Sequence, residues 1–180
     1  TDRYVGEWKH GKRHGKGVCE YADGSRYEGA WANDGRSGHG VCDYYNGEKY
    51  VGAWSKNKRH GKGRLDCSSP VPDSGAQAGM VWYDGDWKND NQNGMGEATY
   101  TNGDRYVGQW EGYVRSGRGV CEGKDGTRYD GMWERDMRNG PGVCTYPDGD
   151  RYDGEWKNDR RHVRKANWRG LPGAPVDDPV

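Results

Sequence analysis

The sequence contains no phenylalanine and no isoleucine, and only two of its 180 residues are leucine. Its mean hydropathy is −1.32. Such a shortage of aliphatic side chains is typical of disordered chains, but disorder also requires a large net charge. Here 28 basic residues balance 28 acidic residues, and nine tryptophans and 13 tyrosines supply apolar surface. We therefore expect a folded chain with an aromatic core.

Signals for membrane insertion and for catalysis are also missing. No apolar run has the length of a membrane-spanning helix or of the apolar part of a signal peptide. The sequence shows no nucleophile elbow, no phosphate-binding loop and no His/Cys cluster at metal-ligand spacing. We expect a chain that is not an enzyme and that carries no cofactor and no metal.

What the sequence does contain is an internal repeat. The pattern Tyr-x-Gly-x-Trp recurs seven times, and its tyrosines are 23 residues apart except at one step of 33 residues. A period of this size is typical of repeat architectures, in which each unit packs on its neighbours. The seven copies begin at Tyr4, Tyr27, Tyr50, Tyr83, Tyr106, Tyr129 and Tyr152.

Within one repeat the side chains alternate with a period of two. Tyr4, Gly6 and Trp8 share one face of an extended strand, and Gly15-x-Gly17-x-Cys19 continues the alternation on a second strand. A polar stretch between them, 9–14, suits a hairpin loop. Asp-Gly or Asn-Gly follows the second strand in five of the repeats, and these dipeptides favour type I′ turns. Each repeat is therefore predicted to add two antiparallel strands.

Four cysteines, Cys19, Cys42, Cys121 and Cys144, occupy the same position of four repeats. Neighbouring repeats of two strands each lie about 9–10 Å apart, whereas a disulfide needs Cα atoms within roughly 7 Å. These cysteines are predicted to be unpaired and buried, which fits an intracellular, reducing setting. We expect a cytoplasmic protein, associated with the cytoskeleton or with a membrane.

The segments YVGEW, YEGAW, YVGAW, YDGDW, YVGQW, YDGMW and YDGEW resemble the MORN (membrane occupation and recognition nexus) repeat family, and Gly-x-Gly follows all of them except the seventh, where Val163 and Lys165 replace the glycines. The resemblance implies an all-β fold, an elongated single-layer antiparallel meander of about seven two-stranded repeats. Repeats one to three occupy 3–63, an irregular insert loop 64–82, repeats four to seven 83–157, a C-terminal capping strand 158–169, and a proline-rich tail 170–180.

The aromatic side chains are predicted to gather on one face of the sheet. A single sheet has no second layer to cover that face, so the rings form a candidate groove for a peptide or an amphipathic helix. The alternative is that the rings are used up in packing between repeats. The candidate groove residues are Tyr4, Trp8, Tyr21, Tyr27, Trp31, Tyr44, Tyr50, Trp54, Tyr83, Trp87, Tyr100, Tyr106, Trp110, Tyr129, Trp133, Tyr146, Tyr152 and Trp156.

Charge is distributed unevenly, although it sums to zero. The nine residues after each repeat tryptophan include 19 Lys/Arg and only six Asp/Glu, so one sheet edge is predicted to be basic. This edge is a candidate site for anionic lipid headgroups or an acidic protein, and ordinary solvated hairpin tips are the alternative. Its densest part consists of Lys12, Arg13, Lys16, Lys56, Lys58, Arg59, Lys62, Arg160 and Arg161.

The functional prediction is a non-catalytic scaffold that binds a protein segment along the aromatic groove or associates with itself. The resemblance to MORN scaffolds implies a homodimer through the C-terminal end and a cytoskeletal or membrane-associated partner. One alternative is peripheral binding of anionic phospholipid through the basic edge, and another is an accessory domain of a larger enzyme. Nucleic acid is not expected, because the aromatic rings belong to the repeat core and the surrounding surface is acidic.

Overall fold

The computed structural model of the protein describes residues 1–67 and 79–162. These residues form one sheet of 14 antiparallel strands, and each strand pairs only with its neighbours along the chain. The predicted all-β meander of seven two-stranded repeats is confirmed. The strands are β1 (Arg3–Lys9), β2 (Lys12–Glu20), β3 (Arg26–Ala32), β4 (Gly35–Asp43), β5 (Lys49–Ser55), β6 (Lys58–Asp66), β7 (Met80–Lys88), β8 (Asn91–Tyr100), β9 (Arg105–Glu111), β10 (Val114–Glu122), β11 (Arg128–Glu134), β12 (Met137–Thr145), β13 (Arg151–Lys157) and β14 (Arg160–His162).

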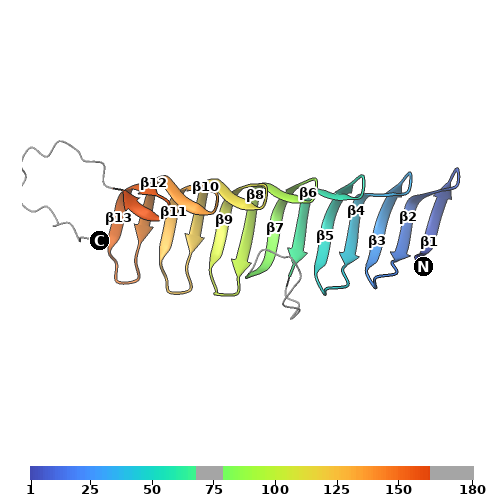
Figure 1. The fold of residues 1–180 in the computed structure, drawn as a ribbon, viewed down its shortest axis with the longest axis horizontal. Helices are drawn as coiled ribbons and strands as arrows, with labels where there is room; N and C mark the ends of the chain where they lie inside the picture. The colour runs from blue at the N-terminus through green and yellow to red at the C-terminus, as the bar shows by residue number, and fades with distance from the viewer. Residues whose placement is uncertain (68–78, 163–180) are drawn as a thin grey trace, which may run out of the picture.

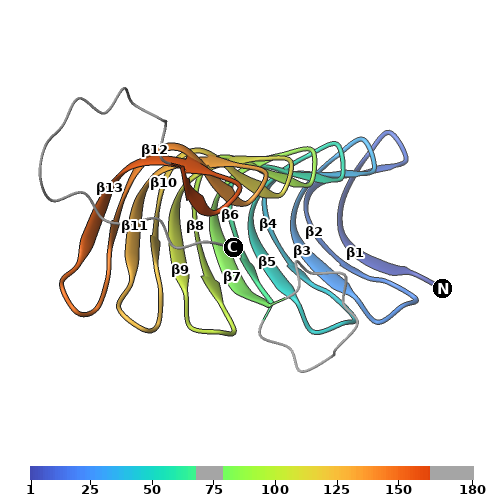
Figure 2. The same cartoon turned by 60° about the vertical axis from the view of Figure 1, so that its left-hand side comes forward.

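The sheet is elongated, and its strands follow one another along the long axis (Figure 1). Each strand is also bent across that axis, so the sheet forms a trough (Figure 2). The bend has a local cause that recurs in the first six repeats. Gly6 pairs with Gly17 and Trp8 pairs with Arg13, which leaves three residues of β2 opposite Glu7. This bulge bends the strand, and Gly15 within it has a φ of 62°.

The hairpin inside each repeat is tighter than predicted. β1 continues to Lys9 and β2 begins at Lys12, so only His10 and Gly11 form the turn in place of the predicted loop over 9–14. Both turn residues have positive φ, at 51° and 72°. Two-residue turns of this kind are type I′, whose twist matches that of the flanking strands.

The turns between repeats correct the sequence prediction. At Asp23-Gly24 only the glycine has positive φ, so this turn is not type I′. Gly24 N donates to Tyr21 O at 3.0 Å and Tyr21 N donates to Ser25 O at 2.8 Å. That pattern is a type I turn closed by a left-handed glycine. Asp23 also accepts a hydrogen bond from Ser25 N, which stabilises the right-handed conformation before the glycine.

The core is a ladder of aromatic rings that runs the length of the sheet. The Tyr27 ring meets Trp31 of its own repeat at 5.2 Å and Trp54 of the next at 5.3 Å, both edge to face. Tyr27 donates through its hydroxyl to Ala30 O, and Trp54 donates through its indole N–H to Gly40 O. Edge-to-face pairs are favourable beyond the area that they bury. Each repeat is thereby attached to the next one.

Most of the predicted groove rings are buried in this ladder, which corrects the idea that they form an open surface. The bent sheet closes around them, and neighbouring repeats cover both sides of each ring. Trp8 is 59% exposed because no described strand lies outside β1. The buried rings are Tyr27, Trp31, Tyr50, Trp54, Tyr83, Trp87, Tyr106, Trp110, Tyr129, Trp133 and Trp156.

The cysteines have the predicted role. All five are free, and Cys19, Cys42, Cys67 and Cys144 are buried while Cys121 is half-buried. Cys19 lies opposite Tyr4 on one side and Tyr27 on the other. These thiols therefore act as small apolar residues in a column beside the rings.

The sheet continues into the segment predicted as an irregular loop. Asp66 of β6 pairs with Trp82 of β7, and Cys67 N donates to Val81 O at 2.7 Å. The loop prediction over 64–82 is therefore wrong at both ends, and 68–78 lie outside the described residues. At the other end β14 pairs with β13 over 160–162. The rest of the predicted capping strand and the proline-rich tail lie outside the described residues.

Candidate functional site

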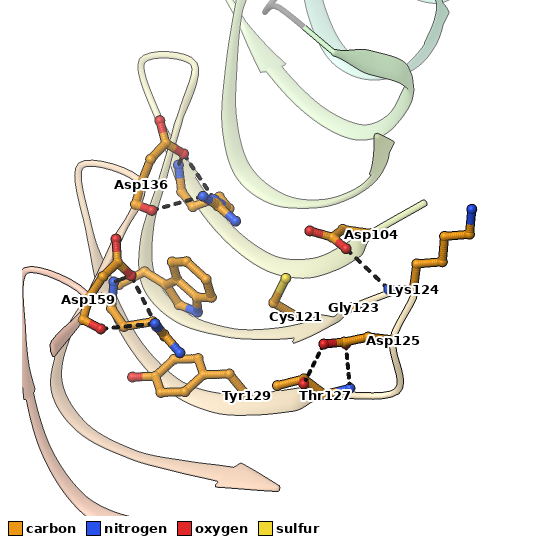
Figure 3. A pocket seen from close by; sticks show the side chains of 12 residues that line it. Asp104, Cys121, Gly123, Lys124, Asp125, Thr127, Tyr129, Asp136 and Asp159 are labelled. Atoms are coloured by element: carbon orange, nitrogen blue, oxygen red, sulfur yellow. Dashed lines mark hydrogen bonds and ion pairs between the residues drawn. The ribbon is translucent and has the colours of Figure 1, made fainter. Parts of the chain in front are cut away.

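The concave face of the trough carries a series of hollows, and these are the candidate site. One has a volume of about 650 Å³, and two others measure about 410 Å³ and 310 Å³. In the first of these, Asp104 and Asp125 come from the turns between repeats, whereas Asp136 and Asp159 come from the turns inside repeats. Both long edges of the sheet therefore contribute to the same surface (Figure 3).

A row of arginines forms much of this surface. The guanidinium carbon of Arg115 lies 4.3 Å from the centre of the Trp133 ring in the next repeat. Its side chain donates to a carboxylate oxygen of Asp136 at 3.0 Å and to the Asp136 backbone oxygen at 2.8 Å. Arg13, Arg36, Arg59 and Arg138 repeat the stacking on Trp31, Trp54, Trp87 and Trp156. The row ties each repeat to the following one and covers the tryptophans.

A row of tyrosines stands beside the arginines, one before the turn to the next repeat in four of the repeats, whereas Cys67 and Gly123 take this position in the third and fifth repeats. Its members are Tyr21, Tyr44, Tyr100 and Tyr146, all half-buried against the core. The Tyr100 ring lies 5.9 Å from the guanidinium carbon of Arg115. Burial raises the pKa of Tyr21 and of Tyr100 to about 12, partly offset by the neighbouring arginines. These rings give the trough an amphipathic wall.

Two repeats depart from the arginine–aspartate pattern. Arg36 faces Asn57 instead of an aspartate, and its Nε atom is buried with no hydrogen-bond partner within the described parts of the chain. In the fourth repeat Gln92 replaces the arginine, is buried, and donates to the Met80 sulfur at 3.3 Å. Because Gln92 stands in place of an arginine, no arginine of the row stacks on Trp110.

Comparison with protein families accounts for the whole periodic region. The model for the MORN repeat matches residues 4–26, 27–49, 50–69, 83–105, 106–128, 129–151 and 152–164. The chain belongs to the MORN repeat family. The resemblance that the Tyr-x-Gly-x-Trp segments carry is thus confirmed. No protein in the curated collection matches the chain.

Two solved structures are similar to this MORN array at low identity. The TCP domain of Drosophila melanogaster SAS-4, in complex with a proline-rich motif of Ana2, is 15% identical, with a TM-score of 0.44 over 79% of this chain and 73% of that chain. The TCP10 domain of Danio rerio CPAP, in complex with a STIL peptide, is 12% identical, with a TM-score of 0.28 over 83% of this chain and 67% of that chain.

The Arg36–Asn57 exception gives a stability prediction. Asn57→Asp is expected to stabilise the array by about 0.5–1 kcal/mol, because it adds the carboxylate that Arg115 and Arg138 already have. Urea denaturation at low salt and at 1 M NaCl measures the gain, which should shrink at high salt. Asn46→Asp is the control, since it adds the same charge at a turn on the opposite edge. An equal gain from both variants would contradict the arginine pairing.

The tyrosine row predicts instability at high pH. The folded pKa of Tyr21 and Tyr100 is raised to about 12 from an unfolded value of 10.0. The folded state therefore holds these protons more tightly than the unfolded state does. Their stabilising effect is complete below pH 10 and is lost as the pH rises towards 12. Tyrosinate absorbance and tryptophan fluorescence should change together in that range, and independent titration near pH 10 would contradict this expectation.

The predicted basic edge divides into two groups. Arg13 and Arg59 do not lie on an exposed edge, because they stack on Trp31 and Trp87 inside the trough. Each also lies within ion-pair distance of an aspartate of the next repeat. The remaining residues are exposed, although Lys62 pairs with Asp86 at 2.8 Å. They are Lys12, Lys16, Lys56, Lys58, Lys62, Arg160 and Arg161.

The convex face differs from the trough. Its apolar side chains, such as Met95 and Met132, are exposed and lie in separate repeats. A hollow of about 480 Å³ over β2, β3 and β4 includes Ala30 and His39. Neither the ordered arginines nor the tyrosine row extends to this face. The trough is therefore the surface that the MORN repeats build most regularly.

Two features are absent from the described residues, a cluster of metal-ligating side chains and a membrane-spanning helix. Within 1–67 and 79–162 no three His, Cys, Asp or Glu side chains are grouped so that they could hold a metal ion. The same residues include no helix with the length and apolarity that crossing a bilayer requires. The side chains in the trough form ion pairs and ring contacts, which are suited to binding.

Sequence reasoning found the aromatic residues but missed the arginine row. The arginines were assigned to a solvent-exposed edge because they follow each tryptophan along the chain. A recurring Arg-x-Gly, followed at a regular distance by Asp or Asn in the next repeat, was the available signal. Its meaning depends on the type I′ hairpin, which folds Arg13 back onto the face that carries Trp31.

Proposed function

We propose that this MORN array is a non-catalytic scaffold that binds an extended segment of a partner protein along its trough. The observation that supports this proposal is the continuous concave surface of half-buried tyrosines and ordered arginines. Its hollows recur from the first repeat to the sixth. A groove with apolar walls and fixed polar groups suits a peptide that is already extended.

The aromatic ladder supports binding indirectly. Because Trp54 and its equivalents hold neighbouring repeats together, the trough is rigid before a partner arrives. A preformed surface lowers the ordering cost of association. The arginines are also held in place by the turn residues of the next repeat, and a guanidinium has five N–H donors, more than these contacts use. Backbone carbonyls of an extended peptide are suitable acceptors for them.

A random library of displayed 12-residue peptides would test the proposal. Peptides selected on the protein are expected to shift the NMR signals of trough residues, such as Tyr44 and the Trp54 indole N–H. Met95→Lys and Met132→Lys on the convex face serve as matched controls and should leave the affinity unchanged. Shifts confined to the convex face, or failure to select any peptide, would overturn the proposal.

Anionic phospholipid is the second candidate, because exposed lysines gather on the edge formed by the turns inside repeats. Lys56 is the first residue of one such turn, and Lys58 begins the strand that follows it. Lys56→Glu with Lys58→Glu should abolish co-sedimentation with phosphatidylserine vesicles if this edge binds lipid, at roughly 1 kcal/mol per charge. Phosphatidylcholine vesicles are the control. Equal sedimentation of the variant and the unmodified protein would exclude this edge.

An accessory role in a larger enzyme, a homodimer and a cytoplasmic location are further proposals. In an accessory role the trough would lie beside a catalytic domain and would still bind a segment in the same way. A homodimer through the C-terminal end would use β14, which has β13 on one side only among the described residues. Sedimentation velocity over a range of concentrations tests the dimer.

A further inference from the structure

One position of the tyrosine row is occupied by glycine. Tyr21, Tyr44, Tyr100 and Tyr146 each directly precede the turn to the next repeat, and Gly123 stands there in the fifth repeat. The turn itself is unchanged, since Gly126 N donates to Gly123 O at 2.9 Å just as Gly24 N donates to Tyr21 O. The fifth repeat therefore keeps its backbone and lacks one ring.

The missing ring coincides with a hollow that is larger than the hollows beside Tyr21, Tyr44 and Tyr100. The hollow at Gly123 measures about 650 Å³, compared with about 410 Å³ beside Tyr21 and Tyr44 and about 310 Å³ beside Tyr100. Figure 3 shows Gly123 between Cys121 and Lys124, with the pairs at Asp136 and Asp159 across the opening. We call this hollow, lined by Gly123, Cys121, Tyr129, Arg115 and Arg138, the Gly123 notch.

The walls of the Gly123 notch are those that surround a tyrosine in other repeats. The Tyr100 ring faces Arg115, with Asp136 and Cys121 near its hydroxyl. One repeat further along the chain, Arg138, Asp159 and Cys144 have the same relation to position 123. Of these three residues, Arg138 and Asp159 line the notch. Arg138 is already held by Asp159, with Nε 3.0 Å from the carboxylate. A ring that enters the notch thus meets a preformed site.

We propose that the Gly123 notch receives a tyrosine side chain from the segment bound in the trough. The bound ring would occupy the place of the tyrosine that this repeat lacks, and its hydroxyl would lie near Arg138, Asp159 and Cys144. The inference rests on the proposed function and adds a specificity-determining position to it. The lining has four carboxylates, Asp104, Asp125, Asp136 and Asp159, against three basic groups, so a basic residue beside the tyrosine is favoured.

Gly123→Tyr is the direct test, because it restores the ring and closes the notch. The backbone accepts a side chain here, since Gly123 is not among the residues with positive φ. An added Cβ would approach only the Asp125 carboxylate closely, at 2.7 Å. The first repeat accommodates Tyr21 and Asp23 in the same arrangement. Gly123→Ala is the matched control, which removes the glycine but leaves the notch open.

Peptides selected on the unmodified protein are expected to contain tyrosine at one aligned position. Their affinity should fall at least tenfold on Gly123→Tyr and should stay within twofold on Gly123→Ala. The near-ultraviolet circular dichroism of both variants is compared first, to confirm that the tryptophan ladder is intact. Peptides that bind Gly123→Tyr as tightly as the unmodified protein would overturn the notch while leaving the trough as the binding surface.

A titration with p-cresol, which is the tyrosine side chain alone, tests the notch independently of any peptide. It should shift the amide signals of residue 123 and of Lys124 in the unmodified protein and in the Gly123→Ala variant. It should not shift these signals in the Gly123→Tyr variant. If no peptide can be selected but p-cresol binds at Gly123, the scaffold proposal fails while the ring site stands. Absence of these shifts in the unmodified protein overturns the ring site.

Discussion

Trp54→Ala is expected to lower the free energy of unfolding by about 3–5 kcal/mol. The substitution removes an edge-to-face contact with Tyr50 at 5.1 Å and another with Tyr27 at 5.3 Å. It also removes the indole hydrogen bond to Gly40 O and the ring beneath Arg36. The contacts with Tyr27, Gly40 and Arg36 join the second repeat to the third, so most of the loss falls on the packing between these two repeats. Urea denaturation followed by circular dichroism measures it.

Trp8→Ala is the matched control for this prediction. Trp8 has the same position in its repeat, but it is 59% exposed and meets only Tyr4, at 5.1 Å. Its replacement is expected to cost less than about 1 kcal/mol, in line with surface substitutions. Similar losses at Trp8 and Trp54 would show that the rings stabilise their own hairpins and do not couple repeats.

Gly40→Ala is the second large effect, and it acts through the opposite change, the addition of one methyl group. A Cβ at Gly40 would lie 2.3 Å from the Tyr27 hydroxyl oxygen and 2.5 Å from two ring carbons. The ring cannot move away easily, because Trp31 and Trp54 hold it on both sides. Overpacking of this kind typically costs about 1–3 kcal/mol. We expect a loss at or above the upper end of that range.

Gly11→Asp is the control for the glycine prediction. Gly11 has a φ of 72°, and an added Cβ would meet no atom within 4 Å. Asp34, Asp90, Asp136 and Asp159 already occupy the same position of the equivalent turns with similar φ. The control should change the stability by less than about 1 kcal/mol. Thermal denaturation of the two variants side by side is the measurement, and an unchanged melting temperature for Gly40→Ala would contradict the packing argument.

Several features of the fold could be predicted from single residues and their spacing. The alternation in Tyr4, Gly6 and Trp8 identifies a strand because side chains two apart share a face. Gly17 could be assigned to ring packing because a ring can lie flat only where no Cβ intervenes, and the Tyr4 hydroxyl does lie over it. The position of Cys19 excluded a disulfide from repeat spacing alone. Each of these inferences depends either on residues that are close together in the chain or on the length of the repeat.

The turn types could not be assigned correctly from dipeptides. Asp23-Gly24 contains the residues of a type I′ turn, but the carboxylate of Asp23 caps the backbone of Ser25 and keeps its own φ negative. Asn33-Asp34 lacks glycine and still adopts positive φ at both residues, at 48° and 69°. There the pairing of the strands on both sides, together with the hydrogen bonds between Arg13 and Asp34, imposes the conformation.

The sequence by itself determined the repeat, the number of strands, the parity of each side chain and the state of the cysteines, because these depend on spacing along the chain. Only the tertiary structure decided that the rings are core and that Arg13 and its equivalents cover them. The reason is the bulge at Gly15 and at the equivalent glycines of the other repeats. These bulges bend the strands and close the sheet around its aromatic face. A flat sheet with the same alternation would have left those rings exposed. The bend also converts a missing ring at Gly123 into a hollow that a partner can fill.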